Sequence, residues 1–351
     1  MSDIIYEDRE RHIVIERSHS YTPAFIALLE RTVWGTGGLA YTMHGVAQSL
    51  NRPAEPHFLS LKEHDELVAA AVRSRKTVRV GENTYNAFHL ALLAVDAPKI
   101  GHGYGKLMAE QSRRHFLREV GTHGLLYGYI EAGNTRSLAL NQRLGYQPIG
   151  LSHTVMFSRL RPQDDARVGR LAATERQGLI QLLNEQYADH GLLDFEQSVQ
   201  VEAYFVLRQG GEIIAGVQAE QLHRTIQRLP GASGRMMLAV LPRLPILRRL
   251  FAAKDCHLLR LGNVYARMGQ EAALFTLVEA LLAREHLHAG VAFVDKRSSV
   301  HRRIAAAGKF GLLNAVLGAT LHVIADFNAV PEEEIAELRR RPLCISPIDV
   351  I

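Results

Sequence analysis

Cysteine and tryptophan are scarce in this chain of 351 residues, which has two cysteines and one tryptophan. Cys256 and Cys344 stand far apart and form no C-x-x-C pair, so the sequence indicates neither a metal motif nor a redox motif. We therefore expect no metal cofactor. A reducing cytoplasm is the simplest compartment for such a chain.

Long apolar runs are also missing. No stretch approaches the roughly 20 apolar residues that a helix needs to cross a bilayer. The N-terminus carries Asp3, Glu7 and Asp8 where a secretory signal would have basic residues and an apolar core. With 47% hydrophobic and 22% charged residues the composition is that of a globular protein, and no membrane association is expected.

An excess of one charge sign is missing as well. The formal net charge is only +5, and it is spread evenly over both halves of the chain. Basic clusters at residues 73–76 and 339–341 are expected to be solvated surface. Nucleic acid is therefore not expected as a partner, although a modest positive field suits a ligand with several phosphate charges.

The order of predicted elements occurs twice. Before residue 160 we expect strands near 13–16, 57–62, 66–73, 87–95, 125–130 and 149–157, and helices near 23–33, 44–50, 104–120 and 135–144. After it we expect strands near 167–171, 203–207, 212–220, 257–265, 290–294 and 320–326, and helices near 174–190, 270–285 and 299–307. This order predicts a duplicated α/β or α+β unit, with domains at 1–160 and 161–351.

An apolar, proline-rich insertion at residues 229–247 interrupts the second half. Such a segment is unlike a freely solvated loop. We expect it to pack across the domain junction, or alternatively to line a subunit contact in a homo-oligomer.

The turn after the strand that ends at Val95 carries the strongest chemical signal. Gly101, Gly103 and Gly105 alternate there, directly before a helix that begins with Lys106 in its first turn. Alternating glycines let the backbone approach a ligand closely. The free amides and the positive dipole end of the helix suit a pyrophosphate. The spacing differs from the G-x-G-x-x-G of dinucleotide sites, and a turn without any ligand is the alternative.

Together with a second segment, this turn resembles the GCN5-related N-acetyltransferases. The run from Val95 to Leu107 is similar to motif A of that family. The run from Glu131 to Tyr146, with Asn134, Ser137 and a closing Leu-Gly-Tyr, is similar to its other signature. The resemblance covers roughly residues 10–160. It implies two GNAT-like domains, each a mixed, mostly antiparallel sheet flanked by helices, the second a degenerate copy without the glycine trio.

The resemblance also implies where acetyl-CoA, or another acyl-CoA, binds as co-substrate. Strand backbone groups would hold the pantetheine, the glycine turn would hold the pyrophosphate, and the start of the next helix would contact either part. The implied coenzyme-binding residues are Leu93, Val95, Ile100, Gly101, His102, Gly103, Tyr104, Gly105, Lys106, Asn134 and Ser137. Asn134 is equally suited to cap that helix.

Two positions depart from the family pattern. Ile100 stands where Arg or Gln is usual, which removes one side chain from the phosphate site. Asn141 stands where the family often has a Tyr that protonates the departing thiolate. An amide cannot donate a proton in that way, although it can hydrogen-bond to the sulfur. The possible substitutes are Tyr104, Tyr127, Tyr129 and Tyr146.

Acyl transfer to an amine needs a base for the ammonium proton and donors for the developing oxyanion. Glu131, at a strand end, and His89, in the central strand, are the candidate bases, although a lone histidine in an apolar strand is more often a core residue. The further candidates for lining the acceptor cleft are Trp34, Tyr41, His57, Glu63 and His64. No Ser or Cys stands in a nucleophile motif, which favours direct attack.

The sequence is therefore interpreted as an N-acetyltransferase or related acyltransferase that acts on a primary amine of a small molecule or peptide. Ile100 and Asn141 permit an alternative, a non-catalytic acyl-CoA-binding or sensing protein. A third hypothesis is a scaffold that binds acidic partners through the arginine clusters.

Overall fold

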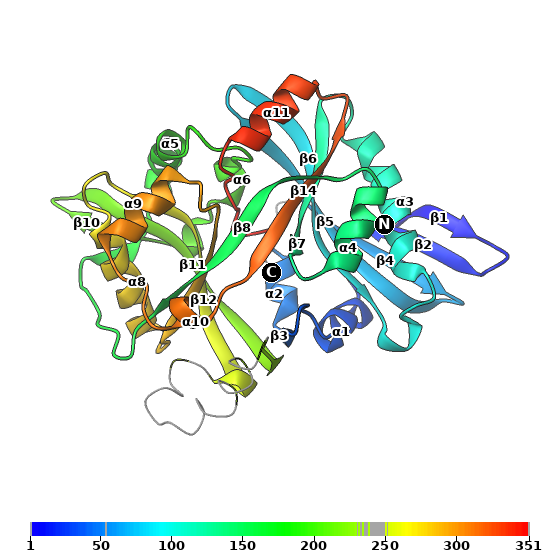
Figure 1. The fold of residues 1–351 in the computed structure, drawn as a ribbon, viewed down its shortest axis with the longest axis horizontal. Coiled ribbons are helices and arrows are strands. Elements are labelled where there is room, and N and C mark those ends of the chain that lie inside the picture. The colour runs from blue at the N-terminus through cyan, green and yellow to red at the C-terminus, as the bar shows by residue number, and fades with distance from the viewer. Residues whose placement is uncertain are drawn as a thin grey trace.

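A 14-stranded sheet extends through both halves of the chain (Figure 1). The computed structural model describes residues 2–52, 55–229, 231, 234, 238, 250 and 252–349. Most of the apolar insertion at 229–247 lies outside these residues. The strand order is β1-β2-β4-β5-β6-β7-β14-β8-β13-β12-β11-β10-β9, and β3 pairs with β11 beside this path. Most neighbours are antiparallel, whereas β6–β7 and β12–β13 are parallel.

The elements of the first half include the predicted ones in the predicted order, together with two strands that were not predicted, β1 and β3. They are β1 (Asp3–Asp8), β2 (Ile13–Ser18), α1 (Pro23–Arg31), β3 (Ala40–His44), α2 (Val46–Leu50), β4 (Pro56–Glu63), β5 (Glu66–Val80), β6 (Asn83–Val95), η1 (Ala97–Lys99), α3 (Tyr104–Glu119), β7 (Gly124–Glu131), α4 (Thr135–Arg143) and β8 (Gln147–Ser158).

The second half repeats this order in outline. Its elements are β9 (Val168–Arg170), η2 (Ala173–Glu175), α5 (Arg176–Gln186), α6 (Phe195–Ser198), η3 (Val201–Ala203), β10 (Tyr204–Gln209), β11 (Glu212–Arg228), η6 (Ala253–Asp255), β12 (Cys256–Ala266), α8 (Ala272–Arg284), β13 (Ala289–Val294), α9 (Ser299–Ala307), α10 (Leu313–Val316), β14 (Thr320–Asn328) and α11 (Glu332–Arg340).

Two helix starts show how local sequence sets the fold. Thr22 Oγ1 accepts from the amide of Phe25 at 3.2 Å, and Pro23 occupies the first helical position of α1. Asn134 Oδ1 accepts from the amide of Ser137 at 3.0 Å and caps α4. The predicted caps are confirmed at both helices.

Alternation along β5 separates two cores. Ala69 and Ala71 face the layer that contains α3, whereas Ala70 and Val72 face the layer that contains α1 and α2. Helices therefore cover both faces of the sheet in the first half. No helix among the described residues is long and apolar enough to span a membrane.

The prediction of a solvated cluster at residues 73–76 is wrong for two of its members. Arg73 and Lys76 are each 3% exposed. Arg73 donates to Ser112 Oγ of α3 at 3.0 Å, and Lys76 pairs with buried carboxylates. These positions tolerate burial because each cation keeps a hydrogen-bond partner.

The two halves exchange their last strands. β14 of the second half pairs with β7 and β8, and β8 of the first half also pairs with β13. Figure 1 shows β8 and β14 crossing the middle of the molecule. The boundary that we propose at residue 160 therefore separates each last strand from strands that it pairs with.

Candidate functional site

The glycine turn before α3 needs glycine for two different reasons. Gly101 and Gly103 have φ of +97° and +89°, and nothing lies within 4 Å of the point that a Cβ would occupy at either residue. The backbone conformation, not space, requires glycine there. At Gly105 a Cβ would lie 3.3 Å from Cγ2 of Val95 and 3.7 Å from Cδ2 of Leu93. The start of α3 thus packs directly on the end of β6.

The N-terminus of α3 presents free backbone donors. Its N-cap, Gly103, has no side chain to accept a hydrogen bond, and the first bond of the helix runs from the Leu107 amide to the Gly103 carbonyl at 3.0 Å. Within the described ranges, no acceptor contacts the amides of Tyr104, Gly105 or Lys106. Such amides, at the positive end of a helix dipole, favour an anion.

Glu63, on β4, contacts this turn through both of its carboxylate oxygens. Its Oε2 lies 2.6 Å from Lys99 Nζ, and its Oε1 accepts from the hydroxyl of Tyr104. The hydrogen bond from Lys99 lowers the pKa of Glu63, and the same carboxylate raises the pKa of Tyr104. The Lys99 charge is therefore already paired. Lys106 lies 3.5 Å from Glu110 in an exposed pair, so the helix amides are the main donors for a bound anion.

Strands β6 and β7 separate beside the turn. Their parallel pairing runs from Asn86 opposite Gly124 to Leu90 opposite Gly128 and stops there, although both strands continue. On its other side β6 stays paired with β5 as far as Val95. One backbone edge of β6 is thus left open to an extended ligand, which can bind by adding a strand.

A β-bulge lies at the start of this opening. Leu90 pairs with Arg73 and Leu93 with Ala71, so Ala91 and Leu92 together oppose Val72. A bulge leaves an extra residue outside the ladder and turns its backbone groups away from the regular direction. Backbone donors are thereby placed where β6 leaves β7.

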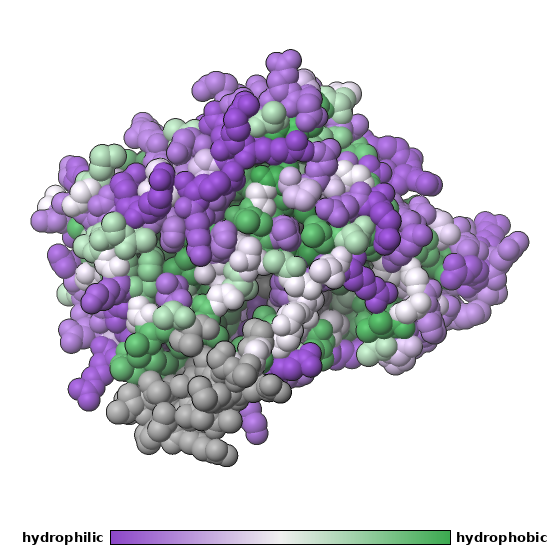
Figure 2. Space-filling model, in the orientation of Figure 1, coloured by the Kyte–Doolittle hydropathy of each residue, from purple (hydrophilic) through white to green (hydrophobic). Residues whose placement is uncertain are grey.

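A cleft of about 860 Å³ connects the turn, the strand opening and the second half. Figure 2 shows hydrophobic side chains gathered toward the middle of one face, with hydrophilic ones around them. The predicted residues that line the cleft are His89, Leu93, Val95, Ile100, Gly101, Gly103, Tyr104, Gly105, Lys106, Glu131, Asn134, Ser137 and Asn141. His102 does not line it.

The acceptor-cleft candidates divide into two groups. Trp34 and Tyr41 line the cleft, whereas His57, Glu63 and His64 do not. His57 is 2% exposed, and its Nδ1 accepts from Arg17 Nε at 3.1 Å. The expectation that the last three residues form the acceptor cleft is therefore wrong.

Glu131 fastens a loop to the cleft. Its Oε2 accepts from Thr36 Oγ1 at 2.7 Å. A Cβ at Gly133 would lie 3.2 Å from Gly37 Cα, so the loop after α1 rests on the turn after β7. Asn141 is engaged within α4, because its Nδ2 donates to the Ser137 carbonyl at 2.9 Å.

A buried charged network underlies the cleft. Lys76 Nζ lies 2.5 Å from both Asp194 Oδ2 and Asp349 Oδ1, and Tyr127 donates to Asp349 Oδ2 at 2.8 Å. Burial opposes the charge on Asp349, but His89 and Lys76 outweigh it and lower its pKa. Asp349 lines the cleft and lies far along the chain from the sequence motifs, so no local signal indicated it.

His89 joins this network through its Nδ1, which is 3.5 Å from Asp349 Oδ1. Burial lowers the pKa of His89 to about 4, although Asp349 acts in the opposite direction. The ring is therefore neutral near pH 7. Its buried Nε2 has no partner in the described part of the chain, and the residue lines the cleft. A proton on Nδ1, facing the carboxylate, leaves Nε2 as an acceptor.

The four candidate tyrosines differ in their hydrogen-bond partners and in whether they line the cleft. Tyr104 is bonded to Glu63 and Tyr127 to Asp349, and Tyr127 does not line the cleft. Tyr129 lines the cleft, 3.5 Å from Asp349 Oδ2. Tyr146 lines it too, and its buried hydroxyl has no partner within the described ranges. Burial raises the pKa of Tyr146, which keeps that hydroxyl protonated.

Comparison with solved structures identifies the architecture. Saccharomyces cerevisiae N-myristoyltransferase with bound myristoyl-CoA matches 96% of this chain and 85% of its own at 12% identity, with a TM-score of 0.59. A second structure of that protein matches 93% of this chain and 85% of its own at 11% identity, with a TM-score of 0.57. A GCN5-related N-acetyltransferase from Kribbella flavida matches 91% of this chain and 72% of its own at 13% identity, with a TM-score of 0.50. The chain has the GCN5-related N-acetyltransferase fold. The predicted fold class is thereby confirmed.

No protein-family model and no curated protein matches the sequence. At 11–13% identity the structural likeness establishes the fold of this chain. The fold is one shared with N-acyltransferases.

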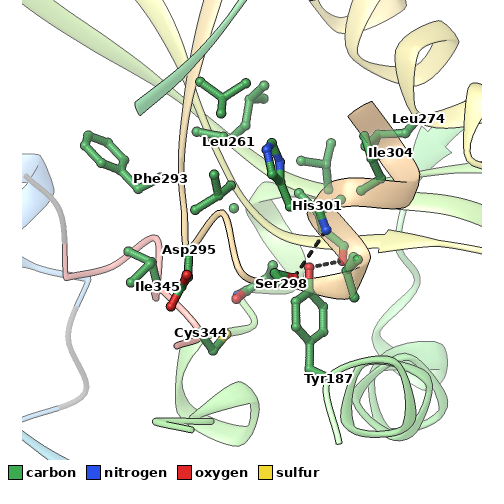
Figure 3. A pocket seen from close by; sticks show the side chains of 18 of the residues that line it. Tyr187, Leu261, Leu274, Phe293, Asp295, Ser298, His301, Ile304, Cys344 and Ile345 are labelled. Atoms are coloured by element: carbon green, nitrogen blue, oxygen red, sulfur yellow. Dashed lines mark hydrogen bonds between the residues drawn. The ribbon is translucent and has the colours of Figure 1, made fainter. Parts of the chain in front are cut away.

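The second half places a smaller cavity at the corresponding point of the GCN5-related fold. Parallel pairing of β12 and β13 stops at Leu261 opposite Ala292, and an apolar cavity of about 100 Å³ lies beside it. Figure 3 shows Leu261, Leu274 and Ile304 around this space. A single glycine, Gly269 with φ +81°, stands shortly before α8. The cavity thus lacks the glycine trio of the first half.

Proposed function

We propose that the protein transfers an acyl group from an acyl-CoA to a primary amine by direct attack on the thioester. One observation carries the proposal: free helix amides and an open strand edge lie along one cleft in the order of the parts of coenzyme A. An anion site without the strand edge would suit any phosphate ligand. The combination suits a pyrophosphate joined to an extended pantetheine.

In this proposal the amides of Tyr104, Gly105 and Lys106 bind the pyrophosphate, assisted by Gly101 and Gly103, which permit the turn. The backbone of Leu93 and Val95 holds the pantetheine as an added strand. Ile100, 58% exposed, supplies apolar cover but no charge. His102 lies within the turn, between Gly101 and Gly103, and Asn134 and Ser137 approach the coenzyme from the start of α4.

The thioester carbonyl then lies at the bulge formed by Ala91 and Leu92. Amides that the ladder leaves unpaired can donate to the oxyanion that develops there. The amine approaches from the side of Glu131, which accepts its proton directly or through water. His89 is the second candidate base, since a neutral ring whose Nε2 has no partner in the described part of the chain can accept a proton.

Tyr146 donates a proton to the departing thiolate in this proposal, because its buried hydroxyl is protonated and has no partner among the described residues. Asn141 assists by keeping Ser137 in place, and it does not itself donate a proton. As the carbonyl collapses, the C–S bond breaks, the amide forms and the thiol receives a proton.

The second half supplies the opposite wall of the acceptor cleft. Leu222, Arg224, Leu258 and Phe293 line it together with Tyr41 of the first half. This wall is largely apolar and favours an amine with an apolar neighbouring group, such as a peptide or a substituted small molecule. We propose the second half as a degenerate copy with this supporting role.

Coenzyme A release tests the proposal. The purified protein is incubated with acetyl-, octanoyl- or myristoyl-CoA and a panel of amines, including peptides with free N-termini, and the free thiol is measured. Amine-dependent release with at least one donor is expected. Tight binding of coenzyme A with no release for any pair would instead favour the sensing protein, which the engaged amide of Asn141 permits.

A further inference from the structure

Three histidines form a row across three neighbouring strands. His223 of β11 pairs directly with His44 of β3 on one side and with His257 of β12 on the other. Residues directly opposite one another project from the same face of a sheet. The ring centroids are accordingly 4.4 Å apart for His44 and His223, and 4.1 Å apart for His223 and His257.

A carboxylate contacts two of these three histidines. Asp255, at the end of η6, places Oδ1 2.8 Å from Nε2 of His223 and 3.0 Å from Nε2 of His257. The three donor atoms lie within 4.8 Å of one another. The side chains are 37%, 37% and 70% exposed for His223, His257 and Asp255, so an ion can reach them.

The donor set matches a zinc-type ion. Two imidazoles and a carboxylate are common zinc ligands, with bonds of about 2.0–2.2 Å. In a tetrahedral site such ligands lie about 3.3 Å apart. The distances from Asp255 Oδ1 to the two imidazole nitrogens, 2.8 and 3.0 Å, are close to that value.

We propose that His223, His257 and Asp255 form a binding site for a divalent transition metal, with zinc as the expected ion. His44 Nε2, 2.9 Å from Thr225 Oγ1, stands beside the site and can supply a fourth ligand by turning away from that hydroxyl. Sequence spacing gave no such signal, because one ligand comes from the neighbouring strand β11 and not from the Asp255-x-His257 segment.

The position of the site suggests a structural role. Its residues alternate along the strands with Leu222, Arg224 and Leu258, which line the cleft. The three ligands join β11 to η6 and to the start of β12, so a bound ion would stabilise this part of the cleft wall. With His44 of β3 as a fourth ligand, the ion would also link the two halves of the chain. The site takes no part in the proposed acyl transfer and does not depend on it.

Zinc titration tests the proposal on the full chain after removal of metal with a chelator. Calorimetry is expected to show one zinc ion per chain, with affinity at least tenfold weaker in each of His223→Ala, His257→Ala and Asp255→Ala. His12→Ala is the matched control, because His12 and His64 also stack, with centroids 4.6 Å apart, but are not part of the carboxylate cluster.

Cobalt offers a readout that does not depend on the variants. Co²⁺ bound by the wild-type chain is expected to give visible absorption bands of a four-coordinate site, displaced by one equivalent of zinc. Absence of saturable zinc binding at micromolar concentration would overturn the proposal. Unchanged affinity in His223→Ala and Asp255→Ala would overturn it as well.

Discussion

Lys76 Nζ lies 2.5 Å from Asp349 Oδ1, and this ion pair joins β5 to the C-terminal segment beneath the cleft. Both side chains are almost fully buried, as is Asp194, the second partner of Lys76. A cation between two carboxylates compensates charges that burial alone would make very costly. The floor of the cleft therefore depends on residues from three distant parts of the chain.

Removing the cation tests this dependence. Lys76→Met leaves two buried carboxylates without their counter-charge, and we expect the free energy of unfolding to fall by about 3–5 kcal/mol. Lys62→Met is the matched control, because Lys62 pairs with Glu16 at 2.9 Å where both side chains are partly exposed. That change should cost less than about 1 kcal/mol. Equal losses in denaturant unfolding of the two variants would contradict the role of Lys76.

Acid should weaken the fold through His89. Its pKa is lowered to about 4 in the folded chain, so the unfolded chain takes up the proton first as the pH falls. The free energy of unfolding should decrease between about pH 6.5 and pH 4, by about 3 kcal/mol for this group. Burial also lowers the pKa of His57, to about 3, which acts in the same direction.

Unfolding measured across this pH range isolates the contribution of His89. His89→Asn should flatten the decrease, and His64→Asn, at an exposed position, is the control for the substitution itself. A wild-type stability that stays constant from pH 6.5 to pH 4 would show that neither buried ring is held neutral.

Glu131→Gln separates the proposed base from a structural contact. Glutamine can still accept the hydrogen bond from Thr36, so coenzyme A affinity should persist while kcat falls about 100-fold. Thr36→Ala makes the reverse change: it frees the loop but keeps the carboxylate, and should mainly raise KM. If Glu131→Gln retains full kcat for an active amine, His89 or a water serves as the base instead.

The parts of the site that were predictable are those fixed by neighbouring residues. Gly101 and Gly103 adopt positive φ in a turn whose demands are local, and Asn134 caps α4 through the amide of Ser137, only three residues further along the chain. The motif residues accordingly meet along one cleft, apart from His102.

Long-range pairing explains what the sequence could not reveal. Lys76 stands in a run of polar residues on β5 and so resembles a surface residue in the sequence. Its counter-charges, Asp194 and Asp349, come from distant parts of the chain. Similarly, β14 fits the pattern of an ordinary last strand, but it pairs with β7 of the other half. Neither contact can be predicted from the local spacing of apolar and polar residues.

Calorimetric titration of coenzyme A into Gly103→Val and Gly269→Val tests the central claim most directly. Both glycines have positive φ, +89° and +81°, and open space at the Cβ position, so the substitutions impose similar backbone strain. Only Gly103 precedes the free amides of α3. The wild type and Gly269→Val should bind with similar affinity, and Gly103→Val at least tenfold more weakly. No binding by the wild type, or equal affinity in all three proteins, would contradict the account.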